Sequence, residues 1–312
     1  MKIAYLVLAH RNIDQLYKLL DILIAHTDNH VFVHLDSKFN PQIDDKYLNI
    51  NRITFLGNRI NISWGGFSVI AATQLLLKEA YSQSDFDYYI LLSGQCLPIK
   101  SQNEIRGYLK INNGFSFLEA TNKINRDDES YLYKFYYPVF FDALNFIKFD
   151  RIKIGRKRPY VKKLLISWVR KLYKLLRLRR KVPVGIEPHF GSQWWVLHRE
   201  HVKYIFEFIN KRPEIVNYFK YTWAPDELFY QSVLMSSPIK DSIINRFLWY
   251  IDWSANGPPK TLTMDDWEKL EKSDKLFARK FDITVDREII EKVRKRLCDL
   301  AKGRRDERMK EK

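Results

Sequence analysis

The sequence predicts an α/β fold in which a central, mostly parallel sheet is flanked by helices. Short apolar runs alternate with segments of helical periodicity through the first third of the chain, and this alternation is typical of parallel sheets covered by helices. The first unit comprises a strand at Ile3 to Ala9, a helix at Asp14 to Ala25 and a second strand at Val31 to Leu35. The first strand is a continuous apolar run, as expected of a strand that is buried on both faces.

The alternation continues after this first unit. A third strand is expected at Ile53 to Leu56, a helix at Val69 to Tyr81, and a fourth and most apolar strand at Tyr88 to Leu92. Farther along, helices are expected at His201 to Asn210 and from Pro225 onward, because proline suits the first turn of a helix.

Composition limits the class of protein further. The chain has 312 residues, of which 46% are hydrophobic, so it can bury a substantial core. Its two cysteines, Cys96 and Cys298, match no metal-ligand spacing and are expected to be reduced thiols. The apolar run that begins at Ile3 is too short for a signal peptide or a membrane span. We therefore expect a cytoplasmic protein.

The net charge of +16 is concentrated in one segment. Residues 151–181 contain 14 Lys and Arg and no Asp or Glu, whereas the rest of the chain is nearly balanced. Two interpretations are open: an interfacial helix on an anionic membrane, or a helix packed on the protein's own core with a solvated basic face. The absence of acids favours the membrane surface. An apolar stripe lies opposite the basic face and consists of Leu164, Leu165, Trp168, Leu172, Leu175 and Leu176.

The residues that follow each strand are the first candidates for a site, because an open parallel sheet binds ligands beyond the carboxyl ends of its strands. They are His10 and Arg11, then Asp36, then Ser93 to Gln95. Asp36 suits a ribose or base contact of a nucleotide, and it suits a helix cap or turn equally well.

The segment SWGGFS, from Ser63 to Ser68, also has two interpretations. Its glycines would let a phosphate or a sugar approach the backbone at the start of a helix. A tight turn is the favoured alternative, with Ser68 as the helix N-cap and Trp64 in the core.

Acidic residues were considered at two places. Asp226 and Glu227 follow Pro225 at a predicted helix start, where the helix dipole stabilises carboxylates, so both are expected to be ionised at neutral pH. Taken alone, such acids usually serve only the helix. The Asp-x-Asp motif at Asp85 to Asp87 precedes the strand at Tyr88 and is expected at the wrong rim of the sheet for a metal site.

Seven segments occur in the order found in one enzyme family. Together they resemble the Core-2/I-branching β-1,6-N-acetylglucosaminyltransferase and peptide O-xylosyltransferase family, glycosyltransferase family 14, over residues 1–290, as a bacterial-type member. The resemblance implies a GT-A-like fold and an inverting transfer of GlcNAc or xylose from a UDP-sugar, with no cofactor and no obligatory metal. The segments read YLVLAHRN, VFVHLDSK, RINISWGGFS, YYILLSGQCLPIKS, GSQWWVLHRE, APDELFYQSVL and LFARKFD.

The resemblance also implies roles for individual residues. Glu227 matches the catalytic base, and Arg279 and Lys280 match the cations that bind the donor diphosphate. The nucleotide-binding positions are matched by His10, Arg11 and Asp36. Positions near the donor sugar or the acceptor are matched by Trp64, Gly65, Gln95, Ser192, Trp194, Asp226, Trp249 and Asp252.

The same resemblance implies an organisation of the chain. Residues 1–110 would form the nucleotide-sugar-binding βαβ half, residues 111–290 the acceptor and catalytic half with a basic insertion at 151–181, and residues 291–312 a C-terminal helix and charged tail. The acceptor is expected to be a glycan or lipid-linked glycan in cell-surface polysaccharide or glycolipid synthesis. Animal members carry a membrane anchor that is not matched here, so we expect the basic insertion to hold the enzyme peripherally on the inner face of the cell membrane.

Two alternative functions were weighed against glycosyl transfer. High basicity and aromatic content occur in nucleic-acid-binding proteins, but here the charge is confined to one segment, and no nucleic-acid partner is expected. A sugar-nucleotide-binding module that has lost catalysis is disfavoured because Glu227, Arg279 and Lys280 are all present.

Arg279 and Lys280 impose a geometric requirement. Adjacent side chains point to opposite faces of a regular strand, and in a helix they diverge by about 100°. If both cations reach one diphosphate, we expect a turn or irregular backbone there, held against the core by Leu276, Phe277 and Phe281.

Overall fold

A computed structural model gives the fold of the protein, and it describes residues 1–122, 180–254 and 258–310. The basic insertion predicted at 151–181 therefore lies outside the described residues, apart from its last two positions. Arg180, one of these two, is buried: its guanidinium lies over the Tyr218 ring, 3.7 Å from the centroid, and donates to the Tyr221 carbonyl oxygen at 2.7 Å.

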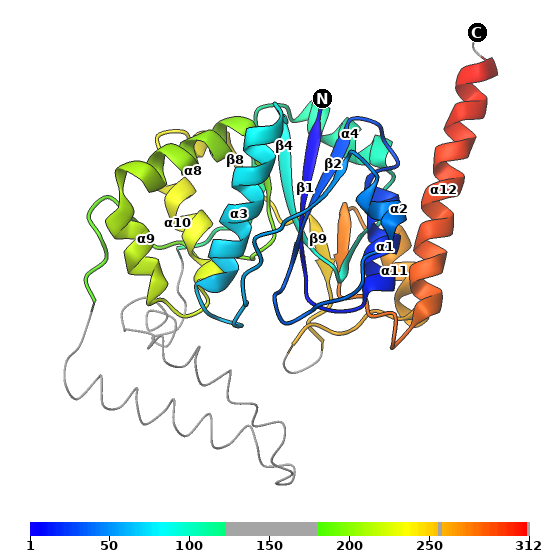
Figure 1. The fold of residues 1–312 in the computed structure, drawn as a ribbon. Coiled ribbons are helices and arrows are strands. Elements are labelled where there is room, and N and C mark those ends of the chain that lie inside the picture. Colours follow the sequence, from blue (N-terminus) through cyan, green and yellow to red (C-terminus); the bar gives the residue numbers. More distant parts are fainter. Residues whose placement is uncertain (123–179, 255–257, 311–312) are drawn as a thin grey trace, which may run out of the picture.

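A seven-stranded sheet forms the centre of the molecule, in the order β3-β2-β1-β4-β7-β6-β8 (Figure 1). Strands β3, β2, β1 and β4 pair in parallel, whereas β7 is antiparallel to both β4 and β6. The four parallel strands are the four that the sequence predicts, and the predicted α/β class is confirmed. The strands are β1 (Ile3–Ala9), β2 (Asn29–Leu35), β3 (Ile53–Phe55), β4 (Tyr88–Ser93), β6 (Ser116–Leu118), β7 (Val196–His198) and β8 (Ile243–Asn245).

Helices cover both faces of the parallel strands because both faces are apolar. All seven residues of β1 are buried. Figure 1 shows α3 (Ser68–Gln83) on one side of β1 and β2, and α1 (Ile13–Leu23) with α12 (Arg287–Lys310) on the other. The leucines of α1 recur at helical spacing and are fully buried, and each such side chain stabilises the fold by roughly 1.5–3 kcal/mol.

The other helices lie around this centre. The prediction that a helix begins at Pro225 is wrong. Pro225–Glu227 form a single 3-10 turn, η2. The α-helix begins only at Phe229, because the φ of −133° at Leu228 lies outside the helical region. These elements are α2 (Asp45–Leu48), α4 (Gln102–Ile111), α8 (Arg199–Lys211), α9 (Pro213–Lys220), α10 (Phe229–Met235), α11 (Trp267–Lys272) and the short 3-10 turns η3 (Lys240–Ser242) and η4 (Met264–Asp266).

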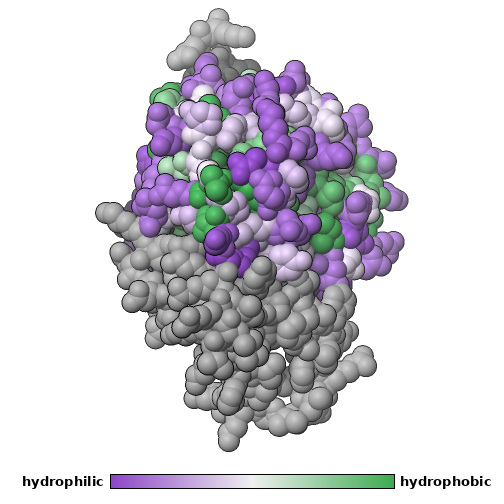
Figure 2. Space-filling view, turned by 90° about the vertical axis from the view of Figure 1, so that its left-hand side faces the viewer, coloured by the Kyte–Doolittle hydropathy of each residue, from purple (hydrophilic) through white to green (hydrophobic). Residues whose placement is uncertain are grey.

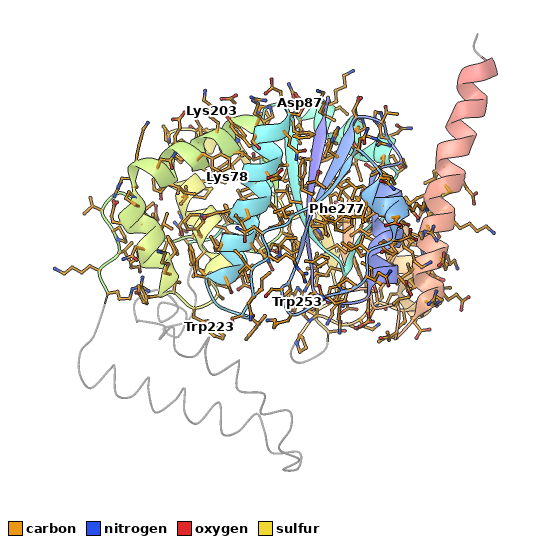
Figure 3. The ribbon with its side chains drawn as sticks, viewed as in Figure 1. Lys78, Asp87, Lys203, Trp223, Trp253 and Phe277 are labelled. Atoms are coloured by element: carbon orange, nitrogen blue, oxygen red, sulfur yellow. The ribbon has the colours of Figure 1, made fainter. Side chains whose placement is uncertain are left out.

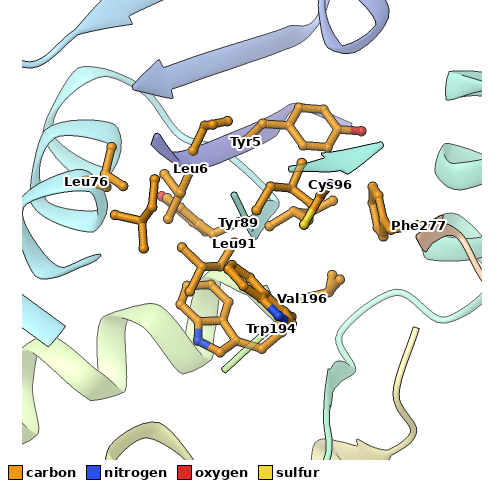
Figure 4. Packing of buried hydrophobic residues seen from close by; sticks show 14 of the residues in the cluster. Tyr5, Leu6, Leu76, Tyr89, Leu91, Cys96, Trp194, Val196 and Phe277 are labelled. Carbon is orange, nitrogen blue, oxygen red and sulfur yellow. The ribbon is translucent and has the colours of Figure 1, made fainter. Parts of the chain in front are cut away.

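A second, three-stranded sheet joins segments that are far apart in the sequence. Its order is β5-β10-β9, from β5 (Cys96–Pro98), β10 (Phe277–Arg279) and β9 (Trp249–Ile251). Figure 4 shows Phe277 and Cys96 in one apolar cluster with Tyr5 and Leu91 of the main sheet. Cys96 and Cys298 are both free, as predicted. The core of the large sheet therefore continues into the small one.

The two rims of the parallel strands differ. Figure 3 places Asp87 at one rim, at the amino end of β4, and Trp223 and Trp253 at the opposite rim. The Asp-x-Asp motif therefore lies away from the carboxyl ends of the strands, as predicted.

The face of the molecule on the side of α8 and α9 is mainly hydrophilic where it is coloured (Figure 2). Within the described parts of the chain, none of the helices is long and apolar enough to cross a bilayer.

Candidate active site

Cations gather beyond the carboxyl ends of β1 and β4. Arg279 ends β10; its Nη1 donates to Ser93 Oγ at 2.6 Å, and its guanidinium lies 4.7 Å from the centroid of the Trp194 ring. Partial burial lowers the pKa of Lys280, and the positive charges of Arg11 and Arg279 lower it further. Arg11 pairs with Asp282 at 2.8 Å, whereas the ion pairs found among the described residues include neither Arg279 nor Lys280. The result is an electropositive site suited to an anion.

His10 lies near these cations, as the causes of its pKa shift show. The loss of solvent around its ring lowers the pKa of His10 most, Arg11 lowers it next, and Arg279 and Lys280 add to the shift, while Asp36 opposes it. The ring is therefore neutral at neutral pH. Arg279 and Lys280 therefore both lie near enough to this histidine to lower its pKa.

The backbone around the two cations is irregular, as predicted. The strand ends at Arg279, the carbonyl oxygen of Lys280 accepts from the Leu262 amide at 2.8 Å, and the Phe281 amide donates to the Gln95 carbonyl oxygen at 2.9 Å. The predicted apolar anchors, Leu276, Phe277 and Phe281, are all buried. Arg279 thus lies at the end of β10, and the residues after it are hydrogen-bonded to other parts of the chain.

Asp36 is a turn residue. Its Oδ1 accepts from the Lys38 amide at 2.9 Å, and its Oδ2 lies 3.4 Å from Lys38 Nζ. Arg59 Nη2 donates to the Asp36 carbonyl oxygen at 2.9 Å and so stabilises the same turn. Of the two interpretations left open by the sequence, the turn is confirmed, and a contact with a nucleotide stays a prediction.

Two half-buried carboxylates, Asp226 and Glu227, lie on the short turn η2. Burial raises the pKa of Asp226 to about 6. The pKa of Glu227 is raised to about 8, first by burial and then by the negative charges of Asp226 and Glu119. The expectation of an ionised carboxylate at neutral pH is therefore wrong for Glu227, because a single 3-10 turn provides little of the dipole that a long helix would and burial dominates. Asp226, with a pKa about one unit below neutral pH, stays mostly ionised as expected. Asp226 Oδ1 is buried without a hydrogen-bond partner among the described residues.

The segment from Gly191 to Trp194 links these carboxylates to the cations. The Gly191 amide donates to the Glu227 carbonyl oxygen at 2.9 Å. Ser192 Oγ accepts from the Trp194 amide at 3.3 Å, and the Ser192 carbonyl oxygen accepts from Gln231 Nε2 at 2.6 Å. The ring of Trp194 then lies under the Arg279 guanidinium. The Gly191 to Trp194 segment therefore contacts both the turn that carries Glu227 and the side chain of Arg279.

Gly191 permits a close backbone contact in that segment, and replacing it by alanine is expected to destabilise the protein. A Cβ at this position would lie 1.8 Å from the Glu119 carbonyl oxygen, which is backbone and cannot move aside. We expect a loss of about 3 kcal/mol in the free energy of unfolding, by analogy with overpacked cores. Urea denaturation measures this loss.

Gly107 provides a matched control for that substitution. It lies within α4, and a Cβ added to it has nothing within 4 Å. Gly107→Ala is therefore expected to stabilise the protein by roughly 0.5–1 kcal/mol, since alanine is the better helix former. Equal stability of the two variants would contradict the close contact at Gly191.

Trp64 and Gly65 lie next to the turn that carries the two carboxylates, since the Gly65 carbonyl oxygen accepts from the Ala224 amide at 2.9 Å. The predicted core position of Trp64 is wrong, because 77% of the residue is exposed and its ring packs edge-on against Trp223, with centroids 5.3 Å apart. Gly65 has φ +77°, and a Cβ on it would lie 2.8 Å from the Trp223 ring, so Trp223 occupies the inner position. Ser68 is not the N-cap either: the helix cap is Phe67, and the Ser68 hydroxyl accepts from the Ser63 amide at 2.8 Å.

The remaining predicted contacts have different positions. Gln95 is buried, and its Nε2 donates to the Phe281 carbonyl oxygen at 3.2 Å. Trp249 is only 2% exposed, and its ring stacks on Phe277 with centroids 4.9 Å apart. Trp249 is therefore a core residue, and the prediction that it contacts the acceptor is wrong. Asp252 is partly exposed, and its Oδ1 accepts from the Ser254 amide at 2.8 Å.

Four residues of the site were not found from the sequence. Gln15 on the first turn of α1, Asp282 after the cations and Glu119 after β6 contact or influence Phe281, Arg11 and Glu227, respectively. Asn12, the N-cap of α1, donates to Asp282. Gln15 alone had a usable signal, because it is a polar residue on the apolar face of a helix. Among the described residues, no three His, Cys, Asp or Glu side chains come close enough to hold a metal ion.

A mostly parallel sheet thus carries two half-buried carboxylates and a cluster of cations near the carboxyl ends of its strands. A family model described as "Core-2/I-Branching enzyme" matches residues 3–275. The chain therefore belongs to the Core-2/I-branching enzyme family. The observed sheet, mostly parallel and flanked by helices, fits the GT-A-like class that the resemblance implies.

Curated relatives are similar to the chain at low identity. It is 23% identical to Xylosyltransferase 1 of Homo sapiens over 93% of this chain and 30% of that protein. It is 24% identical to Xylosyltransferase 2 of Rattus norvegicus over 93% of this chain and 33% of that protein. The chain thus spans about a third of the length of these relatives. A crystal structure of S. aureus TarS residues 1–349 with UDP-GlcNAc covers 40% of this chain and 36% of that chain, with 16% identity and a TM-score of 0.30.

Proposed function

We propose that the protein transfers a sugar, GlcNAc or xylose, from UDP to a hydroxyl of a glycan acceptor with inversion at the anomeric carbon. The observation that carries this proposal is the cluster of Arg11, Arg279 and Lys280 near the carboxyl ends of β1 and β4, where Arg279 lies on Ser93 and on the Trp194 ring and the Gly191 amide of the same segment donates to the Glu227 carbonyl oxygen. Guanidinium and ammonium groups suit the oxygens of a diphosphate. Family membership supports the transfer of a sugar, and the names of the curated relatives support xylose as one candidate.

The chemistry needs one base and a stabilised leaving group. Glu227 takes the proton of the acceptor hydroxyl while that oxygen forms a bond to the anomeric carbon. The bond between the anomeric carbon and the diphosphate oxygen breaks in the same step, and its electron pair stays on the diphosphate. Arg279 and Lys280 stabilise the charge that develops there, which is the task a divalent metal has in other transferases. The proposed reaction therefore needs no obligatory metal.

A transfer assay in the presence of a chelator tests the proposal. The protein is incubated with UDP-GlcNAc or UDP-xylose and a panel of glycan acceptors, and released UDP is measured with and without EDTA. We expect release that survives EDTA. Activity that disappears with chelation and returns with Mg²⁺ or Mn²⁺ would contradict the metal-free mechanism, and failure of every UDP-sugar to raise the melting temperature would contradict the donor class.

The pH dependence of the reaction follows from the carboxylates. A base works only when it is ionised, and the pKa of Glu227 is raised to about 8, so kcat/KM is expected to rise about tenfold per pH unit up to that value. Asp226→Asn removes one of the negative charges that raise this pKa. The rising limb of its pH profile is therefore expected to lie at lower pH than that of the wild type.

The initial-rate profile between pH 5.5 and 9.5 measures this difference between the wild type and Asp226→Asn. Asp241→Asn, an acid in the turn η3 outside the site, is the control and is expected to leave the profile in place. A limb that stays at the same pH in Asp226→Asn would show that Glu227 is not the group whose ionisation limits the rate.

We further propose that the protein acts on a precursor of a surface glycan at the inner face of the cell membrane, held there by residues 151–181. Support comes from the basic and acid-free composition of that segment. Sedimentation with vesicles that contain anionic phospholipid tests this, using the full chain and a variant with the Lys and Arg of 151–179 replaced by Gln. Equal sedimentation of both proteins would contradict the proposal.

A further inference from the structure

Gln15 is a fully buried polar residue on the core-facing side of α1. It is 0% exposed and lies in a helix whose other buried positions are mainly leucine and isoleucine. A buried amide side chain is stable only if its donors and acceptor are satisfied. Its partners therefore show what the residue is for.

All the partners of Gln15 lie in two loops of the candidate site. Its Nε2 donates to the Gly94 carbonyl oxygen at 2.9 Å and to the Phe281 carbonyl oxygen at 3.1 Å. Its Oε1 accepts from the Ile283 amide at 2.8 Å. One side chain thus joins α1, the connection between β4 and β5, and the segment that follows Lys280.

The segment after Lys280 receives further bonds from the same two regions. Gln95 Nε2 also donates to the Phe281 carbonyl oxygen, at 3.2 Å, and the Phe281 amide donates to the Gln95 carbonyl oxygen at 2.9 Å. Asn12 Nδ2 donates to Asp282 Oδ1 at 3.1 Å, and Asp282 pairs with Arg11. Since Phe281 directly follows Lys280, these bonds determine where the two cations are presented.

We propose that Gln15 is a positioning residue for the diphosphate site. It fixes the backbone on the carboxyl side of Lys280 against Gly94, so that Arg279, Lys280 and Arg11 keep one spacing before a ligand arrives. Pre-organised charges stabilise a dianion without the cost of rearranging the loop. The inference rests on the proposed function, because it assumes that these cations receive the diphosphate of a nucleotide.

A positioning role and a merely structural role predict different ligand profiles. If Gln15 only supports the fold, its loss weakens all ligands to a similar extent or weakens none. If it positions the cations, its loss weakens UDP, which carries the diphosphate, and spares uridine, which does not. The ratio of the two dissociation constants separates the alternatives.

Gln15→Met and Gln102→Met are the matched pair of variants. Methionine keeps the length of the side chain and removes its hydrogen bonds. Gln102 is also buried, at 7% exposed, but it lies on α4, where its Oε1 accepts from Tyr5 Oη at 2.7 Å and from Asn29 Nδ2 at 2.7 Å. Calorimetry with UDP and ligand-observed NMR with uridine give the dissociation constants, and circular dichroism checks the fold.

We expect Gln15→Met to bind UDP about tenfold more weakly, since small displacements of charged groups have effects of this size or larger. Uridine binding is expected to change less than about twofold, and Gln102→Met is expected to leave the ratio unchanged. A wild-type ratio in Gln15→Met, or the same change of ratio in Gln102→Met, overturns the inference. If the wild type itself does not bind UDP, the proposed function fails first, and this inference fails with it.

Gln95→Met provides the same test if Gln15→Met does not fold. It removes the second side-chain bond to the Phe281 carbonyl oxygen and leaves the backbone bond between Phe281 and Gln95 in place. A smaller but selective weakening of UDP supports the positioning role. Equal weakening of UDP and uridine overturns it.

Discussion

Glu227→Gln is expected to lower kcat about 10³-fold while leaving the affinity for UDP unchanged within about twofold. The amide has the shape of the carboxyl group but cannot take a proton from the acceptor hydroxyl. The donor-binding cations lie at the other end of the Gly191 to Trp194 segment and keep their contacts. Measured UDP release gives kcat, and calorimetric titration with UDP gives the affinity.

A loss of stability is not expected to account for the loss of activity in Glu227→Gln. Below its pKa of about 8 the folded protein holds Glu227 mostly protonated, so at pH 6 the neutral amide is expected to cost little in the free energy of unfolding. Glu214→Gln is the control, because Glu214 is an exposed residue of α9 that pairs with Arg212. Retention of more than a tenth of wild-type kcat in Glu227→Gln would remove it from the role of base.

Arg279→Met is expected to lower kcat/KM for the UDP-sugar by about 10²–10³-fold. The substitution removes the charge nearest to Trp194 and the donor to Ser93 Oγ, while methionine still covers the Trp194 ring. Arg279→Lys restores the charge without the planar fork and is expected to recover part of the loss. Initial rates at several donor concentrations separate the effect on KM from that on kcat.

Arg246→Met is the matched control for Arg279→Met. Arg246 is an arginine directly after β8, and it is paired with Asp274 at 2.7 Å on the surface. Surface pairs of this kind contribute about 0–1 kcal/mol, so its loss is expected to leave donor kinetics unchanged. Equal UDP affinity in Arg279→Met and the wild type would contradict a diphosphate site at this position.

The parallel half of the fold could be predicted from the sequence because its signals are local. The apolar run of β1 and the leucine spacing of α1 each lie within a dozen residues, and both elements occur where expected. The small sheet could not be predicted in this way. Its strands have three residues each, and β10 is defined by partners near Cys96 and Trp249 rather than by its own periodicity.

The candidate site was likewise predicted only in part: residues within recognisable motifs were found, whereas properties that depend on distant residues were not. Glu227, Arg279 and Lys280 were identified from motif order, and in the structure one segment, Gly191 to Trp194, contacts both the Glu227 backbone and the Arg279 side chain. The ionisation of Glu227 was mispredicted, because its pKa depends on burial and on the charges of Asp226 and Glu119, which are distant in sequence or not visible as neighbours in a helix pattern. The positions of Trp64 and Trp249 were mispredicted for the same reason, since Trp223 and Phe277 determine which indole ring is covered.

The three-stranded sheet has a consequence for biosynthesis. Its middle strand, β10, brings residues 277–279 between partners at 96–98 and 249–251, so its pairing closes a loop of most of the chain. Contacts of such long sequence separation form late and slow the folding rate. A nascent chain can build the parallel strands while it is still on the ribosome, but of the three cations only Arg11 is present until Arg279, Lys280 and the segment through Asp282 have emerged. Catalytic competence would therefore be the last property that this polypeptide gains during synthesis.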